Sequence, residues 1–397
     1  MGYDFDTIIE RRGTSSLKWD FTQRFAPGRS GLLPLWVADM DFPAPREIQE
    51  AIQARVDHGV FGYTLEPDSW FDAAAAWLQR RHGWTVPREW MLPTPGVIPG
   101  LVAAILALTE PGDGVVIQPP VYYPFPLRIR GNGRRVVENP LRLTGSRWDM
   151  DLDGLERAID SGTRMLVLCS PHNPVARVWE PDTLRRLAAI CAARGVVIAS
   201  DEIHCDLTMP GFRHVPIATV SPEAASISVT LLSATKTFNL AGLGGALSVV
   251  PDPRLRARLE KVHSAIFAGP ANAIAVVATE AAWRRGDAWL DELRAYVQAN
   301  FHYMTAFFAD TMPVVKAFPL EGSYLALLDM RGLGMNDQRL NDILLGTAKV
   351  WFDEGPIFGR GGEGLQRINL ACPRRILDEC LTRMARAFGG AAEEPSH

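Results

Sequence analysis

The central part of the chain alternates short apolar runs with longer amphipathic stretches. The apolar runs have the length of buried strands and fall at 114–118, 165–169, 196–200, 227–232 and 246–250. The stretches between them have helical periodicity, most clearly at 99–109, 182–194 and 253–268. This alternation is typical of a mostly parallel sheet that is covered by helices on both faces. We therefore predict an α/β fold for this part.

The pattern changes near residue 286. A long helical stretch at 288–311 is followed by a strand at 324–329, a polar helix near 336–346 and an alternating strand at 365–371. These elements predict a second, smaller α+β domain. We divide the chain into an N-terminal segment that contributes to the small domain (1–45), a large domain (46–285), the small C-terminal domain (286–388) and a disordered tail (389–397).

Composition narrows the class of partner. The net charge is −4 and the basic residues are dispersed, so we expect no nucleic acid and no anionic membrane as partner, but a small molecule. The longest apolar run, 101–108, is too short to span a bilayer. Five cysteines without CxxC spacing, and an N-terminus without the apolar run of a signal peptide, indicate the cytoplasm.

Lysine is rare in this chain. Only five of the 41 basic residues are lysines, at positions 18, 236, 261, 316 and 349. A lysine can lose its proton when it is partly desolvated and can then form a Schiff base, whereas arginine cannot. Lys236 follows an apolar strand and precedes an apolar, glycine-rich segment, so we predict a chemical role for it. We expect the other four lysines to be solvated.

Two polar residues follow neighbouring strands in the same way. Asp201 ends the apolar run VVIAS and would hold a ring nitrogen protonated, although a turn or helix cap is the simpler role. Asn173, in the sequence SPHNP, would donate to a phenolate oxygen, or it would serve only as a turn residue.

Other residues match the remaining parts of a phosphorylated aromatic ligand. Gly96 and Val97 precede a helix and would bring backbone N–H groups to a phosphate, as Ser233 and Thr235 would with their hydroxyls. One ring of the doublet Tyr122-Tyr123 would stack on a heteroaromatic ring.

Arg367 would bind a substrate carboxylate through two N–H groups. Each of these positions also has an ordinary structural role as an alternative. Gly96 would be a plain loop glycine, Tyr122 and Tyr123 would be buried structural aromatics, and Arg367 would form a salt bridge on an edge strand.

Together these residues supply a phosphate cradle, a stacking ring, an acid, an amide and an imine-forming lysine, the set that pyridoxal phosphate requires. We predict no metal site, because the eight histidines are scattered and HExxH spacing is absent. The sequence also lacks a GxSxG elbow, a Walker A motif and a GxGxxG after a strand.

The motifs themselves resemble those of a known family. LPLWVADMDF, FGYT, TPGVIPGL, IQPPVYYPF, SPHNPVARVW, SDEIHCDL, KTFNLAGL and RINLACPR occur in order from Leu33 to Arg374. They are similar to motifs of the class I/II aminotransferase superfamily of fold type I pyridoxal phosphate enzymes. The closest resemblance is to its carbon–sulfur lyase branch, of the cystathionine β-lyase and cystalysin type. It implies a large domain with a mostly parallel seven-stranded sheet.

The resemblance also implies a role for each matching position. Lys236 would form the imine with the cofactor, Asp201 would pair with its ring nitrogen, and Asn173 would bond its phenolate oxygen. Tyr123 would stack on the ring, and Arg367 would hold the substrate carboxylate. The residues implied around the phosphate are Gly96, Val97, Ser233, Thr235 and, from the neighbouring subunit of a homodimer, Tyr63.

Two positions depart from the wider superfamily, and one segment departs within the lyase branch. His204, also counted among the cofactor-binding residues, stands where many aminotransferases have tyrosine, and it suits the lyase branch. Gly244 stands where aminotransferases often have a phosphate-binding arginine, which implies a less charged phosphate site. The sequence FDEGPIFG, at 352–359, differs from the NDGSTFG-like sequence that is more usual within the branch. Because this loop should lie near the substrate side chain, the resemblance does not identify the substrate.

The reaction predicted first is β-elimination from L-cystathionine or a related L-cysteine S-conjugate. In it Lys236 removes the Cα proton and a thiolate leaves from Cβ, which gives pyruvate, ammonia and a thiol. An aminotransferase would use the same residues and is the alternative. A regulatory protein with the same fold is the third possibility, although intact Lys236, Asp201 and Arg367 argue against a purely non-catalytic role.

Overall fold

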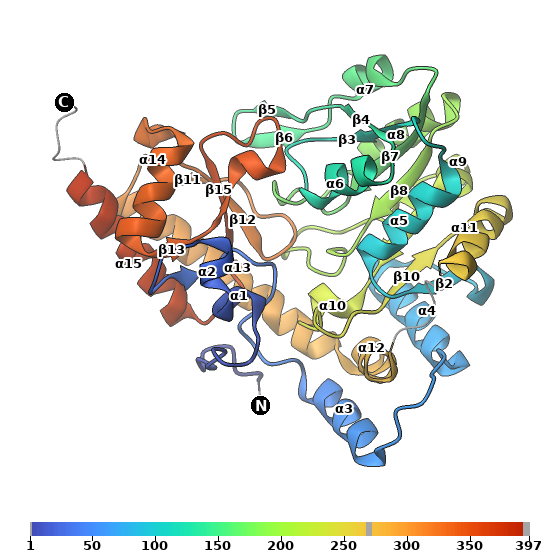
Figure 1. The fold of residues 1–397 in the computed structure, drawn as a ribbon, viewed down its shortest axis with the longest axis horizontal. Helices are drawn as coiled ribbons and strands as arrows, with labels where there is room; N and C mark the ends of the chain where they lie inside the picture. Colours follow the sequence, from blue (N-terminus) through green and yellow to red (C-terminus); the bar gives the residue numbers. More distant parts are fainter. Residues whose placement is uncertain (1, 267–271, 392–397) are drawn as a thin grey trace.

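A computed structural model describes residues 2–266 and 272–391 of the chain. Its larger sheet has seven strands in the order β2-β10-β9-β8-β7-β3-β4 (Figure 1). Their bounds are Met91–Thr94, Ala246–Val249, Ser228–Leu232, Val197–Asp201, Thr163–Cys169, Gly114–Ile117 and Arg135–Glu138. Strand β10 is antiparallel to both of its neighbours, and the other pairs are parallel. The predicted fold class, with a mostly parallel seven-stranded sheet, is confirmed.

Side chains of this sheet enter separate apolar cores on its two faces. In β7, Met165 and Val167 belong to one core, while Leu166 and Leu168 belong to the other. The first core includes residues of α5 (Val97–Leu108), α6 (Pro124–Gly131) and α11 (Pro253–Ala265). The second includes residues of α7 (Leu152–Ala158), α8 (Pro181–Ala193) and α9 (Pro222–Ile227). A strand buried on both faces needs apolar residues at every position, which is the pattern seen in the sequence.

A four-stranded antiparallel sheet forms the second part, in the order β11-β12-β15-β14. Its strands are Lys316–Ala317, Leu325–Asp329, Leu365–Asn369 and Asp353–Glu354. The helices of this part are α13 (Asp287–Thr311), α14 (Asp337–Asp342) and α15 (Arg374–Ala391). The polar helix predicted near 336–346 is shorter than expected, because a wider helical turn at Ile343–Ala348 follows α14.

The N-terminal segment lies against this second part (Figure 1). It contains α1 (Leu17–Asp20), α2 (Thr22–Phe25) and β1 (Leu33–Pro34), and β1 pairs in parallel with β13 (Val350–Trp351). The remaining helices are α3 (Arg46–His58), α4 (Asp68–His82), α10 (Ala234–Thr237) and α12 (Ala273–Arg285). The remaining strands, β5 (Arg142–Thr144) and β6 (Arg147–Asp149), form a hairpin. Short 3₁₀ turns lie at Arg88–Trp90, Ile217–Thr219, Arg331–Leu333 and Gly355–Phe358.

The predicted domain boundaries stay predictions. The boundary at 285/286 falls at Gly286, between the end of α12 and the start of α13. Helix α15 continues to Ala391, through the first residues of the tail predicted to be disordered, and 392–397 lie outside the described residues. Among the helices of the described ranges, none is both long and apolar enough to cross a bilayer.

Candidate active site

The carboxyl ends of β7, β8 and β9 face a cavity of about 280 Å³. Ligands of open α/β sheets bind at this edge, because the loops that follow parallel strands meet there. Seven residues predicted for the site line the cavity: Gly96, Val97, Asn173, Asp201, His204, Thr235 and Lys236. The fold thus brings together residues that are far apart in the sequence.

Lys236 lies in the short helix α10, directly after β9. The Ser233 hydroxyl caps this helix by accepting a hydrogen bond from the backbone N–H of Thr235 at 3.1 Å. Lys236 Nζ enters the cavity and donates to the carbonyl oxygen of Ala38. Burial lowers the pKa of Lys236 to about 8, so about a tenth of the amine is neutral at pH 7. That is the condition a nucleophilic lysine needs.

Asp201 is the last residue of β8, and its side chain is buried at the cavity wall. Its Oδ1 accepts a hydrogen bond from the backbone N–H of Ile203 at 3.1 Å. Burial raises the pKa of Asp201 to about 7. A cation bound next to it would favour the carboxylate form, so the position suits a protonated ring nitrogen.

Asn173 and Arg367 come from different parts of the fold, and Asn173 lines this cavity whereas Arg367 lines an adjoining cavity of about 820 Å³. Arg367, in β15, donates from Nη1 to Asn173 Oδ1 at 2.9 Å and from Nη2 to the carbonyl oxygen of Trp36 at 3.0 Å. Arg367 also forms an ion pair with Asp353. Since Asn173 Oδ1 is engaged, its amide N–H groups remain for a ligand oxygen.

The predicted phosphate end lies at the start of α5. Gly96 is the N-cap of this helix and Val97 its first residue, so unpaired backbone N–H groups face the cavity. Gly244 is required beside it, because its φ is +74° and a Cβ would lie 2.9 Å from the carbonyl oxygen of Pro95. Any side chain at position 244 would therefore strain this loop.

Ser233 and Thr235 differ in their position relative to the cavity. Thr235 lines the cavity, whereas Ser233 is not among the residues of its wall. Ser233 Oγ donates to the carbonyl oxygen of Gly245 at 2.7 Å and lies 2.8 Å from Thr235 Oγ1. Ser233 therefore holds the loop together, and the phosphate contact predicted for it stays a prediction.

The tyrosine doublet is placed differently from what we expected. Tyr122 lines the 280 Å³ cavity together with Asp201 and Lys236, whereas Tyr123 lines only an adjoining cavity of about 820 Å³. Both rings lie at the larger cavity, which also contains Lys236 and Arg367. The sequence offered no signal to choose between two adjacent tyrosines. The structure makes Tyr122 the ring beside Asp201.

His204 contributes a neutral imidazole to the cavity wall. Burial lowers the pKa of His204 to about 3, and the positive charges of Lys236 and Arg367 act in the same direction. Its Nδ1 is buried and has no hydrogen-bond partner among the described residues. Such an unpaired polar atom in a cavity is a position where a ligand would bond.

Tyr63 lies outside the cavity of its own chain. It follows α3 in an extended segment, and its side chain is fully exposed, as are large parts of Val60, Phe61 and Leu65. An exposed position is compatible with a contact to a second subunit, and the predicted role of Tyr63 there stays a prediction.

One part of the site was not recognised from the sequence. Residues 36–42, here called the 36–42 segment, have no regular secondary structure, yet all of them line the larger cavity, and Ala38 also lines the smaller one. The Ala38 carbonyl oxygen accepts hydrogen bonds from Lys236 Nζ and, at 2.9 Å, from the Tyr324 hydroxyl. Asn369 Nδ2 donates to the Val37 carbonyl oxygen at 2.8 Å. The segment therefore connects the lysine of the large sheet to β15 of the small one.

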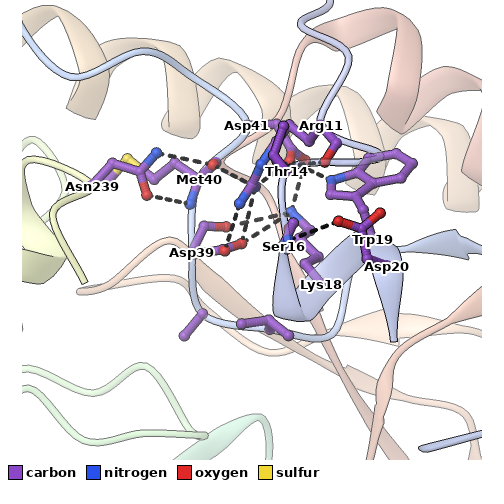
Figure 2. Close-up of polar contacts among 12 residues, drawn as sticks. Arg11, Thr14, Ser16, Lys18, Trp19, Asp20, Asp39, Met40, Asp41 and Asn239 are labelled. Atoms are coloured by element: carbon purple, nitrogen blue, oxygen red, sulfur yellow. Dashed lines mark hydrogen bonds and ion pairs between the residues drawn. The ribbon is translucent and has the colours of Figure 1, made fainter. Parts of the chain in front are cut away.

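Charged residues hold the other end of this segment (Figure 2). Arg11 donates to Asp39 at 2.8 Å and to Asp41 at 2.8 Å, and Lys18 Nζ lies 2.7 Å from Asp41. Trp19 Nε1 donates to Asp41 at 3.0 Å. The prediction that Lys18 is solvated was wrong, because its side chain is completely buried. Its partner Asp41 lies 23 positions away, which local sequence patterns do not reveal.

A second polar cluster lies away from this site. Ligand atoms of His82, Cys205 and Asp206 lie within 4.8 Å of one another, a separation that would allow a metal ion. However, His82 Nε2 lies 2.8 Å from Asp206 Oδ1, which also accepts from Trp77 at 3.0 Å. These groups already satisfy one another, and Arg81 and Arg294 line the same pocket, where their charge would disfavour a cation.

The family model for class I and II aminotransferases matches residues 32–384. The chain belongs to this family. The resemblance based on the motifs is thereby confirmed. This family member is 42% identical to cystathionine β-lyase PatB of Bacillus subtilis, over 97% of this chain and 100% of that protein. It is 33% identical to protein MalY of Escherichia coli, over 97% and 99% of the two chains.

A solved structure of a similar protein has the same fold. Cystalysin from Treponema denticola, whose crystal structure contains pyridoxal 5'-phosphate, is 36% identical to this family member. The two structures superpose with a TM-score of 0.95 over 98% of this chain and 100% of that chain. The carbon–sulfur lyase branch is thus the part of the family to which this protein is most similar among these relatives.

Proposed function

We propose that this protein is a pyridoxal phosphate-dependent carbon–sulfur β-lyase that cleaves L-cystathionine or related L-cysteine S-conjugates. The main support is the placement of Lys236, with its lowered pKa, in one cavity with Asp201 and Asn173, beside Arg367. The full-length similarity to PatB, named as a cystathionine β-lyase, favours elimination over transamination. The products would be pyruvate, ammonia and a thiol.

The residues of the cavity fit the cofactor. The helix start at Gly96 and Val97 offers N–H groups to a phosphate, and Gly244 leaves the space open. Asp201 would pair with the ring nitrogen and Tyr122 would stack on the ring, while His204 has an unpaired nitrogen in the wall. When bound, pyridoxal phosphate supplies an aldehyde that combines with amines and a ring that accepts the electron pair released at Cα.

The protein's own groups would perform the proton transfers. Lys236 Nζ, neutral in part because of its burial, would hold the cofactor covalently, yield to the substrate amine and then take the Cα proton. Arg367 would orient the substrate through its α-carboxylate. Loss of the Cα proton and cleavage of the Cβ–S bond release a thiolate and an enamine, which water converts to pyruvate and ammonia. An aminotransferase would use the same residues but would release an oxoacid without a thiol.

The test is to incubate the purified enzyme with L-cystathionine and other cysteine conjugates and to measure pyruvate and thiol. We expect both products in equal amounts without an added oxoacid. Lys236→Arg keeps the positive charge but cannot form the covalent link, so we expect turnover to fall by about a thousandfold or more, with loss of the visible cofactor absorbance. Amino-group transfer to an oxoacid without pyruvate release would refute the lyase proposal.

We further propose a homodimer with shared active sites, located in the cytoplasm. The exposed Phe61, Tyr63 and Leu65 form an apolar surface next to α3 and α4, which would be covered by a second copy of the chain. Tyr63 would then reach the phosphate of the neighbouring site. The five cysteines are unpaired and buried, which suits a reducing compartment.

A further inference from the structure

Arg367 already binds a carboxylate of its own chain. Strands β14 and β15 are antiparallel neighbours, and their register places Asp353 directly opposite Arg367. The two side chains form an ion pair, and both residues are buried. They also line the 820 Å³ cavity together with Lys236. A resident carboxylate therefore lies where the proposed substrate carboxylate has to bind.

The hydrogen bonds of the guanidinium leave no free binding edge. A carboxylate binds a guanidinium through two parallel N–H groups, either Nη1 with Nη2 or Nε with Nη2. Both edges include Nη2, which donates to Trp36 and pairs with Asp353. Nη1 donates to Asn173, and Nε is buried without a hydrogen-bond partner within the described part of the chain. Bidentate binding of a new carboxylate thus requires that Asp353 or the Trp36 carbonyl oxygen leave Nη2, and of these two only Asp353 is a charged competitor.

We propose that Asp353 occupies the substrate-carboxylate position of Arg367 in the resting protein and is displaced when an amino acid binds. This inference rests on the proposed role of Arg367. Asp353 thereby weakens the binding of every substrate that carries an α-carboxylate, because each must compete with a neighbour that is held in place by the strand register. It leaves the later proton transfer at Lys236 unaffected.

The surroundings of Asp353 add to the cost of displacement. Burial raises the pKa of Asp353 and the adjacent Glu354 acts in the same direction, whereas the charge of Arg367 lowers it, so the carboxylate form depends on this arginine. A carboxylate that leaves its arginine inside the protein loses the interaction that offsets its desolvation. The bound amino acid must supply that free energy.

The experiment compares two probes that have no leaving group at Cβ. L-Alanine has the α-amine and the α-carboxylate, whereas L-alaninamide has the amine alone, and both change the visible absorbance of the holoenzyme on binding. Asp353→Asn removes the competing charge with little change of shape. We expect it to bind L-alanine about tenfold more tightly and L-alaninamide within about twofold of the unaltered enzyme. In turnover, KM should fall while kcat is retained.

Glu354→Gln is the matched control, because Glu354 is the next residue of β14 and contacts Asn341 instead of Arg367. We expect no tighter binding of L-alanine, because loss of the Glu354 charge would only favour the carboxylate form of Asp353, and no change with L-alaninamide. Asp353→Ser serves as a second variant if the asparagine variant does not fold. Equal effects on L-alanine and L-alaninamide, or none on L-alanine, would overturn the proposal.

Arg367→Gln separates this proposal from the one on which it rests. If L-alanine binds as well to this variant as to the unaltered enzyme, the substrate role of Arg367 is wrong. If Arg367→Gln abolishes the preference for L-alanine but Asp353→Asn does not increase it, only the competition is wrong. A protein that shows no cofactor absorbance at all would refute the proposed function itself.

Discussion

Lys18 and Lys236 are both enclosed by protein, but their surroundings favour different protonation states. Lys236 faces a cavity, and its burial lowers its pKa to about 8. Lys18 is completely buried and lies 2.7 Å from the carboxylate of Asp41, whose pKa is lowered by the lysine despite its own burial. The charge of Lys18 is therefore matched by a fixed partner, whereas that of Lys236 is easily lost. This difference suits Lys18 to structure and Lys236 to chemistry.

The buried pair predicts a large loss of stability on removal of one partner. Lys18→Met would leave the buried Asp41 with Arg11 as its one remaining cation, so we expect a loss that approaches but stays below the about 3–5 kcal/mol of a completely unpaired buried charge. Urea unfolding followed by tryptophan fluorescence should show this loss. Lys261→Met, at an exposed lysine of α11, should stay within about 0.5 kcal/mol of the unaltered protein. Equal stabilities of the two variants would contradict the structural role of Lys18.

At the scale of elements, the site depends on a segment without helix or strand. Asn239 Oδ1 accepts a hydrogen bond from the Met40 N–H at 3.0 Å, and its Nδ2 donates to the Met40 carbonyl oxygen at 3.0 Å (Figure 2). Nδ2 also donates to the carbonyl oxygen of Phe42 at 2.8 Å. These bonds replace the ladder that a strand would have provided. Asn239 itself has φ +57°, a conformation that asparagine tolerates better than most residues.

Two substitutions separate the side chain of Asn239 from its backbone. Asn239→Gly removes the three hydrogen bonds but keeps the left-handed backbone accessible, whereas Asn239→Ala also adds about 1 kcal/mol of backbone strain. We expect hydrogen exchange of residues 36–42 to become faster in both variants, with lower stability for the alanine variant. Unchanged exchange in both would show that Asn369 and Arg11 hold the segment without Asn239.

At the scale of the whole molecule, the exposed apolar residues between α3 and α4 have no cover within the described chain. Leu65 and Phe61 expose 75% and 58% of their surfaces, and Tyr63 is fully exposed. In a monomer these apolar side chains contribute no free energy of burial, whereas a second copy of the chain would bury them. The proposed site between subunits therefore requires that this surface be the dimer contact.

The double variant Phe61→Asp/Leu65→Asp should convert the proposed dimer into monomers, because two carboxylates would be buried at the contact. Sedimentation velocity measures this, and cofactor affinity should fall in parallel as Tyr63 is lost from the neighbouring site. Phe212→Asp, at another exposed aromatic, should leave both properties unchanged. An unaltered protein that is monomeric and fully active would contradict the shared site.

The sequence by itself determined the α/β class, five of the seven strands of the large sheet and the choice of Lys236, Asp201, Asn173 and Arg367 as candidates. Local periodicity encodes strands, and polar residues that follow buried strands must meet at one sheet edge. Only the tertiary structure decided which tyrosine lies beside Asp201, that Lys18 is buried and that Asp353 pairs with Arg367. These outcomes depend on distances between residues far apart in the chain, such as Lys236 and Ala38, which no local pattern records.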